Sequence, residues 1–154
     1  MDIHEINSIL REKAVKAGLC DEWQTKIWNR DLNVTELLSI FKRGIDFSIK
    51  TDWLDYGFCK MVFTAEELHE SGIYIDEEVD IRAAESGTYV LIGECTGQIT
   101  FRDFSVGNVY VRHTSDMRIT SIDMAKVFVS VYDDANAECV GLDGGTIKRY
   151  DRRK

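Results

Sequence analysis

The chain has 154 residues, of which 44% are apolar and 30% charged, and its net charge is −8. A chain this apolar folds instead of staying disordered, and it contains no run of about 20 apolar residues that would cross a membrane. Residues 1–86 hold 18 acids and 10 bases, whereas residues 87–154 hold nine of each. Because the first half repels phosphate backbones, we do not expect it to bind nucleic acid.

The first eleven residues carry charges of both signs where a signal peptide would have a basic start and an apolar run. We therefore expect a cytoplasmic protein. The cysteines lack the C-x-x-C spacing of zinc and redox sites, so we interpret them as buried apolar residues and expect neither a metal nor a cofactor. They are Cys20, Cys59, Cys95 and Cys139.

The beginning of the chain shows the spacing of amphipathic helices. Apolar residues recur every three or four positions over residues 3–17, which predicts a helix, and Gly18 offers a stop. A second short helix is expected to carry Trp23 and Trp28. We interpret the aromatic side chains of this region, Trp53 included, as core residues instead of a ligand-stacking surface.

Two N-cap signals mark further helices. Asn33 precedes an apolar pattern that runs over residues 34–49 and covers two sides of a helix, which predicts a helix packed between other elements. Thr64 followed by Glu67 matches a capping box and predicts a short helix that ends near Gly72.

The densest acidic stretch follows, where eight acids between Glu66 and Glu85 accompany the single base Arg82. On a strand, such acids form a solvated edge that discourages aggregation. They would also suit a surface that mimics a polyanion for a basic partner. The candidate partner-binding residues are Glu66, Glu67, Glu70, Glu77, Glu78 and Asp80.

At Gly72 the apolar spacing changes from helical to alternating, which predicts strands. We therefore expect a helical cap at residues 1–72 and a β domain at residues 73–154, with one shared core. The strands expected after Gly87 follow one another too closely for any helix between them. They cover residues 89–92, 98–101, 108–112, 117–120, 126–131, 137–140 and 146–150.

Small residues recur at intervals of ten along these strands, in two series separated by one interval of eighteen. A recurring small residue marks a tight corner where a larger side chain would clash. Internal repeats of this kind are typical of repeat architectures. The first series is Gly87, Gly97 and Gly107, and the second is Ala125, Ala135 and Gly145.

Two folds fit strands at this spacing. We favour an α+β protein with a short two-sided β-solenoid over an antiparallel β-sandwich or meander, because residues two strands apart resemble each other. With 19 to 20 residues per coil, Ile119 would stack near Cys139 and Tyr110 near Phe128. On the same basis Val109 and Val111 would lie near Val127 and Val129.

Aspartates at the last corners are candidate metal ligands. In a solenoid, Asp123 and Asp143 would stack on one edge, with Asp133 and Asp134 on the other, and stacked carboxylates suit calcium. Alternatively, each carboxylate bonds to the backbone of its own turn. We favour the turn, because the glycine-rich repeat of calcium-binding β-rolls is missing.

The run from Arg112 to Asp116 contains the residue types of a catalytic triad, with His113 and Ser115 between them. Neighbours on one turn rarely reach triad geometry, so we expect no catalytic residue here. The end of the chain is basic, and we interpret it as a solvated terminus and not as a contact for a polyanion. Its bases are Lys148, Arg149, Arg152, Arg153 and Lys154.

Four sequence blocks carry a resemblance to a known group: GIDFSI at residues 44–49, GIYID at 72–76, VYVRH at 109–113 and AKVFV at 125–129. They resemble uncharacterised proteins encoded in phages and prophages of gut Bacteroidales. The resemblance covers most of the chain and implies a mobile-element setting, in the bacterial cytoplasm or on the virion. It also implies a helical cap on a stack of strands, and it implies no reaction.

The leading hypothesis is a nonenzymatic protein-interaction or structural module, whose strands present a stiff ladder of side chains to a protein partner. We also expect homo-oligomers, since an uncovered solenoid end invites association. One alternative is an acidic inhibitor that mimics a polyanion and occupies a basic site on a host protein. The other is a small hydrolase built on His113 and Asp116.

Overall fold

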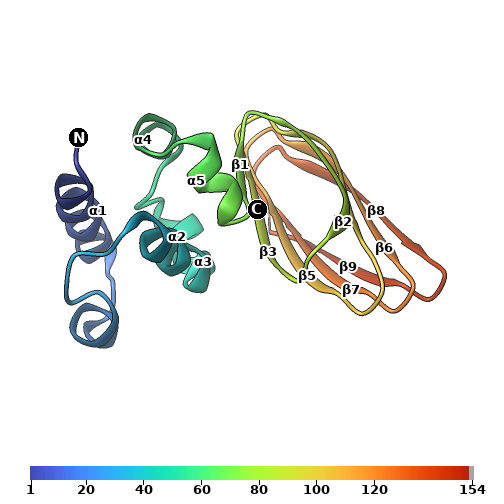
Figure 1. Ribbon diagram of the computed structural model, residues 1–154, viewed down its shortest axis with the longest axis horizontal. Coiled ribbons are helices and arrows are strands. Elements are labelled where there is room, and N and C mark those ends of the chain that lie inside the picture. The colour runs from blue at the N-terminus through green and yellow to red at the C-terminus, as the bar shows by residue number, and fades with distance from the viewer. Residues whose placement is uncertain (153–154) are drawn as a thin grey trace. The chain divides into compact units, whose positions relative to one another are not determined.

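The computed structural model describes residues 1–152. The chain divides into two compact units, Met1–Ser71 and a second unit that begins at Gly72. Within the described residues the first unit contains five α-helices and one π-helix, and the second contains nine strands (Figure 1). The protein is therefore an α+β protein with helices first and strands after them, as the sequence predicts.

The first two helices lie where the sequence predicts them, although the second ends at Ile27 and leaves Trp28 just outside it. Helix α1, Ile3–Ala17, begins at Asp2, whose side chain accepts a hydrogen bond from the Glu5 N–H at 2.9 Å, and it ends at Gly18 in a left-handed conformation with φ 110°. The short second helix is a π-helix, η1, Trp23–Ile27. Its wide turn is closed by the Trp28 N–H, which donates to the Trp23 carbonyl at 2.7 Å.

The region predicted as one helix over residues 34–49 is two helices. Helix α2, Val34–Arg43, opens with a capping box between Asn33 and Glu36, and α3, Ile45–Thr51, follows after Gly44, where the backbone leaves the helical conformation. Glycine favours such breaks because its helix propensity is lower than that of any other residue except proline.

Two short helices complete the first unit. Helix α4, Tyr56–Val62, begins at Asp55 and was not predicted, because its aromatic residues do not show helical periodicity. Helix α5, Ala65–Glu70, has the predicted capping box between Thr64 and Glu67. The end of this helix near Gly72 is confirmed.

The core of the first unit is built around Trp28 and Trp53, as predicted, whereas Trp23 is only partly buried. Trp28 is fully buried and its ring centre lies 5.4 Å from that of Trp53. Phe41 meets the Trp53 ring edge to face at 6.2 Å. The indole N–H of Trp28 donates to the side-chain oxygen of the buried Asn7 at 2.9 Å, so the ring is buried without an unsatisfied donor.

The second unit is a parallel β-solenoid, which confirms the favoured fold and shows that the antiparallel alternative is wrong. Odd-numbered strands form a five-stranded sheet and even-numbered strands a four-stranded sheet, and every strand pair is parallel. Figure 1 looks along the coil, with the two sheets on its two sides. The strands are β1 Ile73–Ile75, β2 Glu78–Ala84, β3 Gly87–Ile92, β4 Thr96–Phe101, β5 Val106–Val111, β6 Asp116–Ile122, β7 Lys126–Val131, β8 Asn136–Leu142 and β9 Thr146–Asp151.

The register of the coils is twenty residues from β3 onward. Ile119 pairs with Cys139 as predicted. The predicted neighbours Tyr110 and Phe128 are wrong by two residues, since Tyr110 pairs with Ser130 and Phe128 with Asn108. Of the valines, Val109 pairs with Val129, which belongs to the predicted set, whereas Val111 pairs with Val131, which does not. The prediction assumed a coil of fewer than twenty residues at these strands. Only the first coil is that short, since residues of β1 pair with residues seventeen positions later and residues of β2 with residues up to eighteen positions later.

A left-handed residue turns the chain at every corner after β3. These residues lie ten apart, and five of the six are not glycine. Aspartate tolerates this conformation better than most residues because its short polar side chain bonds locally. The corner residues are Gly93, Asp103, His113, Asp123, Asp133 and Asp143.

The two series of small residues occupy different positions in the coil, which explains the interval of eighteen. Gly97 and Gly107 are the second residues of β4 and β5, where a Cβ would lie 1.9 Å from the Val79 carbonyl oxygen and 2.2 Å from the Phe101 ring, respectively. Ala125 and Ala135 follow the corners and are fully buried. The true repeat is an unbroken interval of ten.

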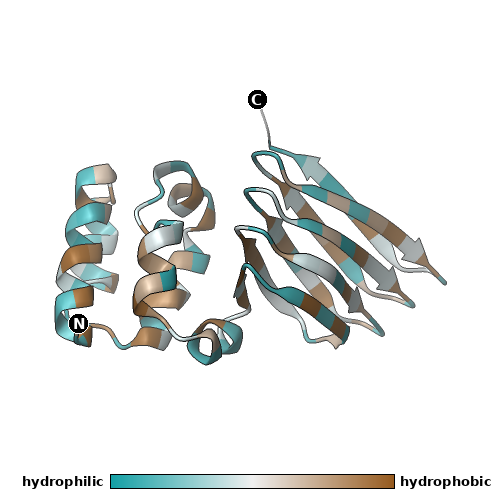
Figure 2. Ribbon diagram, turned by 90° about the horizontal axis from the view of Figure 1, so that it is seen from above, coloured by the Kyte–Doolittle hydropathy of each residue, from teal (hydrophilic) through white to brown (hydrophobic). Residues whose placement is uncertain are grey.

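The solenoid narrows toward its last strands. One inward column shrinks from Phe101 to Ser121 to Gly141 in register, and a Cβ on Gly145 would lie 2.1 Å from the Ser121 carbonyl oxygen. Brown and teal bands alternate along the strands, as expected when alternate side chains face the core (Figure 2). The last strand replaces core valines by the exposed Arg149 and Asp151, so charged groups end the apolar column.

Candidate interaction surfaces

The outer face of the five-stranded sheet carries basic and aromatic side chains together. Val127, Val129 and Val131 belong to the core of the solenoid, so the residues between them point outward. The exposed part of this outer face is here called the basic–aromatic face. It consists of Lys126 and Phe128 of β7, Lys148 and Tyr150 of β9, and Arg152.

The register brings these side chains close together. Phe128 pairs with Lys148, and Phe128 remains 38% exposed, which is high for a phenylalanine in a sheet. The Lys148 ammonium lies 5.5 Å and the Arg152 guanidinium 5.1 Å from the centre of the Tyr150 ring. Two cations therefore flank one ring, an arrangement that orients all three side chains.

No acidic residue occupies an outward position of β5, β7 or β9. The basic residues predicted as a solvated terminus thus belong in part to a strand, since Lys148 and Arg149 lie in β9. Arg153 and Lys154 are outside the described residues. In a protein of net charge −8, this face is a local region of opposite sign, and such a region attracts acidic partners.

The outer face of the four-stranded sheet is acidic instead of basic. Its side chains form two columns in register, and acids outnumber bases in them. Within the columns Gln98 donates to Asp80 at 3.1 Å and Asn136 donates to Asp116 at 3.2 Å. The four acids of these columns accompany one base, Arg118. The columns are Glu78, Thr96, Asp116, Asn136 and Asp80, Gln98, Arg118, Glu138.

The six acids predicted to bind a partner fall in both units. Glu66, Glu67 and Glu70 lie in α5, and Glu67 accepts a hydrogen bond from the Thr64 N–H at 2.9 Å as part of the capping box. Glu77 lies at the first corner of the solenoid, with Glu78 and Asp80 on β2. Asp80 is already bonded to Gln98 and Arg82, so part of the acidic set stabilises local structure.

The corner aspartates lie on two edges of the solenoid, with Asp123 and Asp143 on one and Asp133 on the other. The Asp133 carboxylate accepts from the His113 N–H of the preceding coil at 3.1 Å, whereas the favoured prediction had it bond within its own turn. The Asp76 carboxylate accepts from the Glu94 N–H of the following coil at 2.8 Å. Among residues 1–152 no group of three or more His, Cys, Asp or Glu side chains is placed to hold a metal.

The proposed hydrolase residues are tied to neighbouring coils. The Ser115 hydroxyl is fully buried, donates to the Gly93 carbonyl at 2.9 Å and accepts from the Cys95 N–H at 3.1 Å. The imidazole of His113 accepts from the Gly93 N–H at 3.0 Å through Nδ1. Asp116 lies on the outer face of β6, where it accepts from Asn136. These bonds assign the run a structural role in stacking the coils.

The cysteines are all free thiols. Cys59 and Cys95 are buried as predicted, and Cys139 is half-buried. The prediction is wrong for Cys20, which is exposed beside the end of α1. Burial raises the pKa of the Cys95 thiol, which donates to the Tyr74 carbonyl at 3.3 Å. Burial also raises the pKa of Cys139. A raised pKa disfavours the nucleophilic thiolate.

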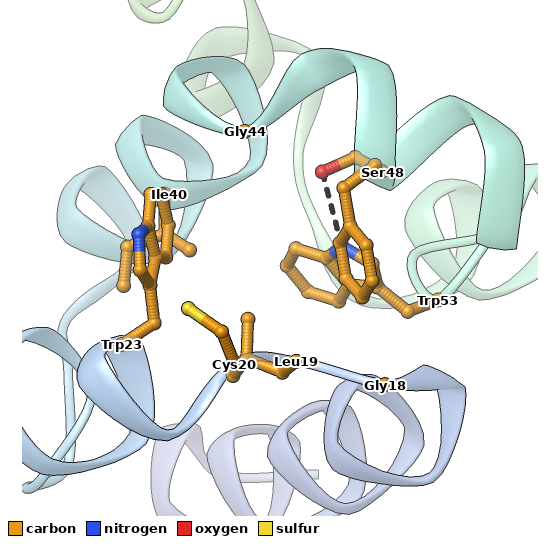
Figure 3. Close-up of a pocket in the computed structure, with 9 residues that line it drawn as sticks. Gly18, Leu19, Cys20, Trp23, Ile40, Gly44, Ser48 and Trp53 are labelled. Carbon is orange, nitrogen blue, oxygen red and sulfur yellow. Dashed lines mark hydrogen bonds between the residues drawn. The ribbon is translucent and has the colours of Figure 1, made fainter.

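The first unit contains an apolar cavity of about 280 Å³. It lies between the end of α1, the start of η1 and the break between α2 and α3, and Figure 3 shows the Trp23 and Trp53 rings on opposite sides of it. No sequence signal pointed to it, because its walls come from three separate segments. The lining residues are Gly18, Leu19, Cys20, Trp23, Ile40, Gly44, Phe47, Ser48 and Trp53.

Comparison with protein family models, with curated proteins and with solved structures finds no match for this chain. The class of protein is therefore defined by the fold alone, a β-solenoid preceded by a helical region. Among the described residues, no helix is long and apolar enough to cross a membrane.

Proposed function

We propose that this protein is a nonenzymatic interaction module whose β-solenoid binds an acidic segment of a protein partner. The observation that carries the proposal is the basic–aromatic face, where the paired strands β7 and β9 hold Phe128, Lys148 and Tyr150, and Arg152 follows directly after β9. Aromatic and arginine side chains are the residue types enriched at binding hot spots. The parallel ladder keeps them at fixed spacing, which lowers the entropy lost on binding.

The chemistry of the partner follows from the side chains of the basic–aromatic face. Its cations select carboxylates, and the exposed Phe128 ring offers an apolar contact between them. Lys148 and Arg152 flank the Tyr150 ring, so that ring is less accessible for stacking on a nucleic acid base. An acidic peptide with interspersed apolar residues satisfies both features. The acidic stretch from Glu66 to Asp80 has no comparable arrangement that favours a polyanion mimic.

The test uses a fluorescein-labelled decapeptide of alternating glutamate and phenylalanine, with fluorescence anisotropy as the readout. We expect saturable binding that weakens as salt rises, because exposed charges are screened. In the variant Lys148→Glu/Arg152→Glu, binding should weaken by about 1–2 kcal/mol, or roughly tenfold. The matched control, Lys26→Glu/Lys50→Glu, makes the same change in net charge at exposed positions of the helical unit and should bind as wild type.

Three results would contradict the proposal. The first is equal binding of a lysine–phenylalanine decapeptide, which would show that charge does not select the partner. The second is equal loss in the two double variants, which would show a general effect of net charge. The third is an oligothymidylate of ten residues that binds more tightly than the acidic peptide, which would assign the face to single-stranded nucleic acid.

A further inference from the structure

The cavity in the helical unit has a lining without charged side chains, and its polar groups are largely satisfied within the protein. The Trp53 indole N–H donates to the Ser48 hydroxyl at 3.0 Å (Figure 3). That hydroxyl donates to the Phe41 carbonyl at 3.0 Å. A ligand would therefore find few polar groups to bind there. Because burying a polar or charged group without a partner is unfavourable, the lining selects uncharged apolar molecules.

The size and rigidity of the cavity narrow the ligand class. Its volume is about 280 Å³ and it is partly open to solvent, which leaves room for a molecule larger than the benzene that an enclosed apolar cavity of about 150 Å³ binds. The backbone helps to shape the walls, since Gly18 holds a left-handed turn and Gly44 lies beside the Trp23 ring, where a Cβ would be 3.4 Å from the ring. A preformed site of this size suits one or two aromatic rings.

Trp23 supplies an independent indication of a binding role. It is the first residue of η1, a π-helix, and π-helical turns are rare and concentrate at functional sites. Its ring is only partly buried, whereas Trp28 and Trp53 are buried. Arg43 lies over the Trp23 ring at 5.5 Å from its centre, and the exposed lining residue Cys20 marks the mouth of the cavity.

We infer that this cavity is a binding site for a small, uncharged aromatic molecule, which stacks between Trp23 and Trp53. The site is independent of the basic–aromatic face, since every lining residue belongs to the helical unit. Its occupant is a small molecule, because a cavity with satisfied polar groups offers nothing to the backbone of a peptide that would carry an apolar side chain into it.

Toluene is the probe, with benzoate as its charged counterpart, and two-dimensional amide NMR of the full chain is the readout. We expect saturable shifts at the amides of Leu19, Cys20 and Gly44 with toluene, and none with benzoate at the same concentration. The variant Cys20→Trp places a ring at the mouth and should weaken toluene binding by about tenfold or more. Cys20→Ser should leave the affinity within about twofold of wild type.

Met61→Trp, at an exposed position of α4, is the control for adding a tryptophan to the helical unit. It should bind toluene as wild type does. The inference is overturned if toluene causes no saturable shifts up to its solubility, if benzoate binds equally well, or if Cys20→Trp binds toluene as tightly as Met61→Trp. A peptide that carries phenylalanine and binds this site more tightly than toluene would also overturn it, in favour of a partner side chain.

Discussion

Replacing Gly97 with alanine is expected to destabilise the solenoid by about 3–5 kcal/mol, which is a large part of the stability of a typical domain. Gly97 has φ 120°, a conformation that L residues rarely adopt, and its Cβ would lie 1.9 Å from the Val79 carbonyl oxygen. The methyl group would therefore push β4 away from β2, the strand with which it pairs. Urea unfolding followed by circular dichroism measures the change.

Gly87→Ala is the matched control for this effect. Gly87 also has a positive φ, 152°, but its Cβ would meet nothing within 4 Å. Alanine at this position therefore has an unfavourable backbone conformation but no clash, and we expect the free energy of unfolding to fall by about 1 kcal/mol. Equal losses for the two variants would show that β2 and β4 are not as close as the structure places them.

Replacing Phe101 with alanine is expected to cost about 3–5 kcal/mol, because it leaves a cavity in the solenoid core. The ring is fully buried and packs edge to face against Tyr89 at 5.5 Å between centres. It also fills the space beside Gly107, where a Cβ would lie 2.2 Å from the ring. Phe101 and Gly107 are therefore complementary in volume.

Because these two residues are complementary in volume, the effects of their substitutions on stability should not be additive. Alone, Gly107→Ala should cost about 1–3 kcal/mol through overpacking. With Phe101→Ala, the added methyl group enters the vacated space, so the double variant should be more stable than the sum of the single effects by at least about 1 kcal/mol. Additive losses in denaturant unfolding would contradict the placement of the ring against Gly107.

Much of the fold could be predicted because its signals are local. Alternating apolar residues predicted the strands, and the predicted N-cap residues Asn33 and Thr64 are each followed by the helix that they cap. The exact register could not be predicted from the small residues, since Gly97 and Ala125 occupy different positions in the coil. The left-handed corners from Asp103 to Asp143 lie ten apart and are the signal that would have fixed it.

The candidate sites were less accessible to prediction because they depend on register and tertiary contact. Phe128 and Lys148 lie twenty residues apart in sequence and become neighbours only when β7 pairs with β9. The acidic run was conspicuous in sequence, yet Glu67 and Asp80 mainly bond to nearby groups. The cavity required the helix break at Gly44 and the π-helix at Trp23, neither of which leaves a periodic pattern.

The proposed interaction surface depends on parallel pairing of residues twenty apart, and a nuclear Overhauser spectrum of the isotope-labelled protein tests this most directly. We predict cross-strand contacts between the backbones of Val109 and Val129, and of Phe128 and Lys148. Close contacts between the α-protons of β7 and β8 would contradict it, because they arise only when consecutive strands pair as antiparallel hairpins. In that case Phe128 and Lys148 would not share a face, and the interaction surface would not exist.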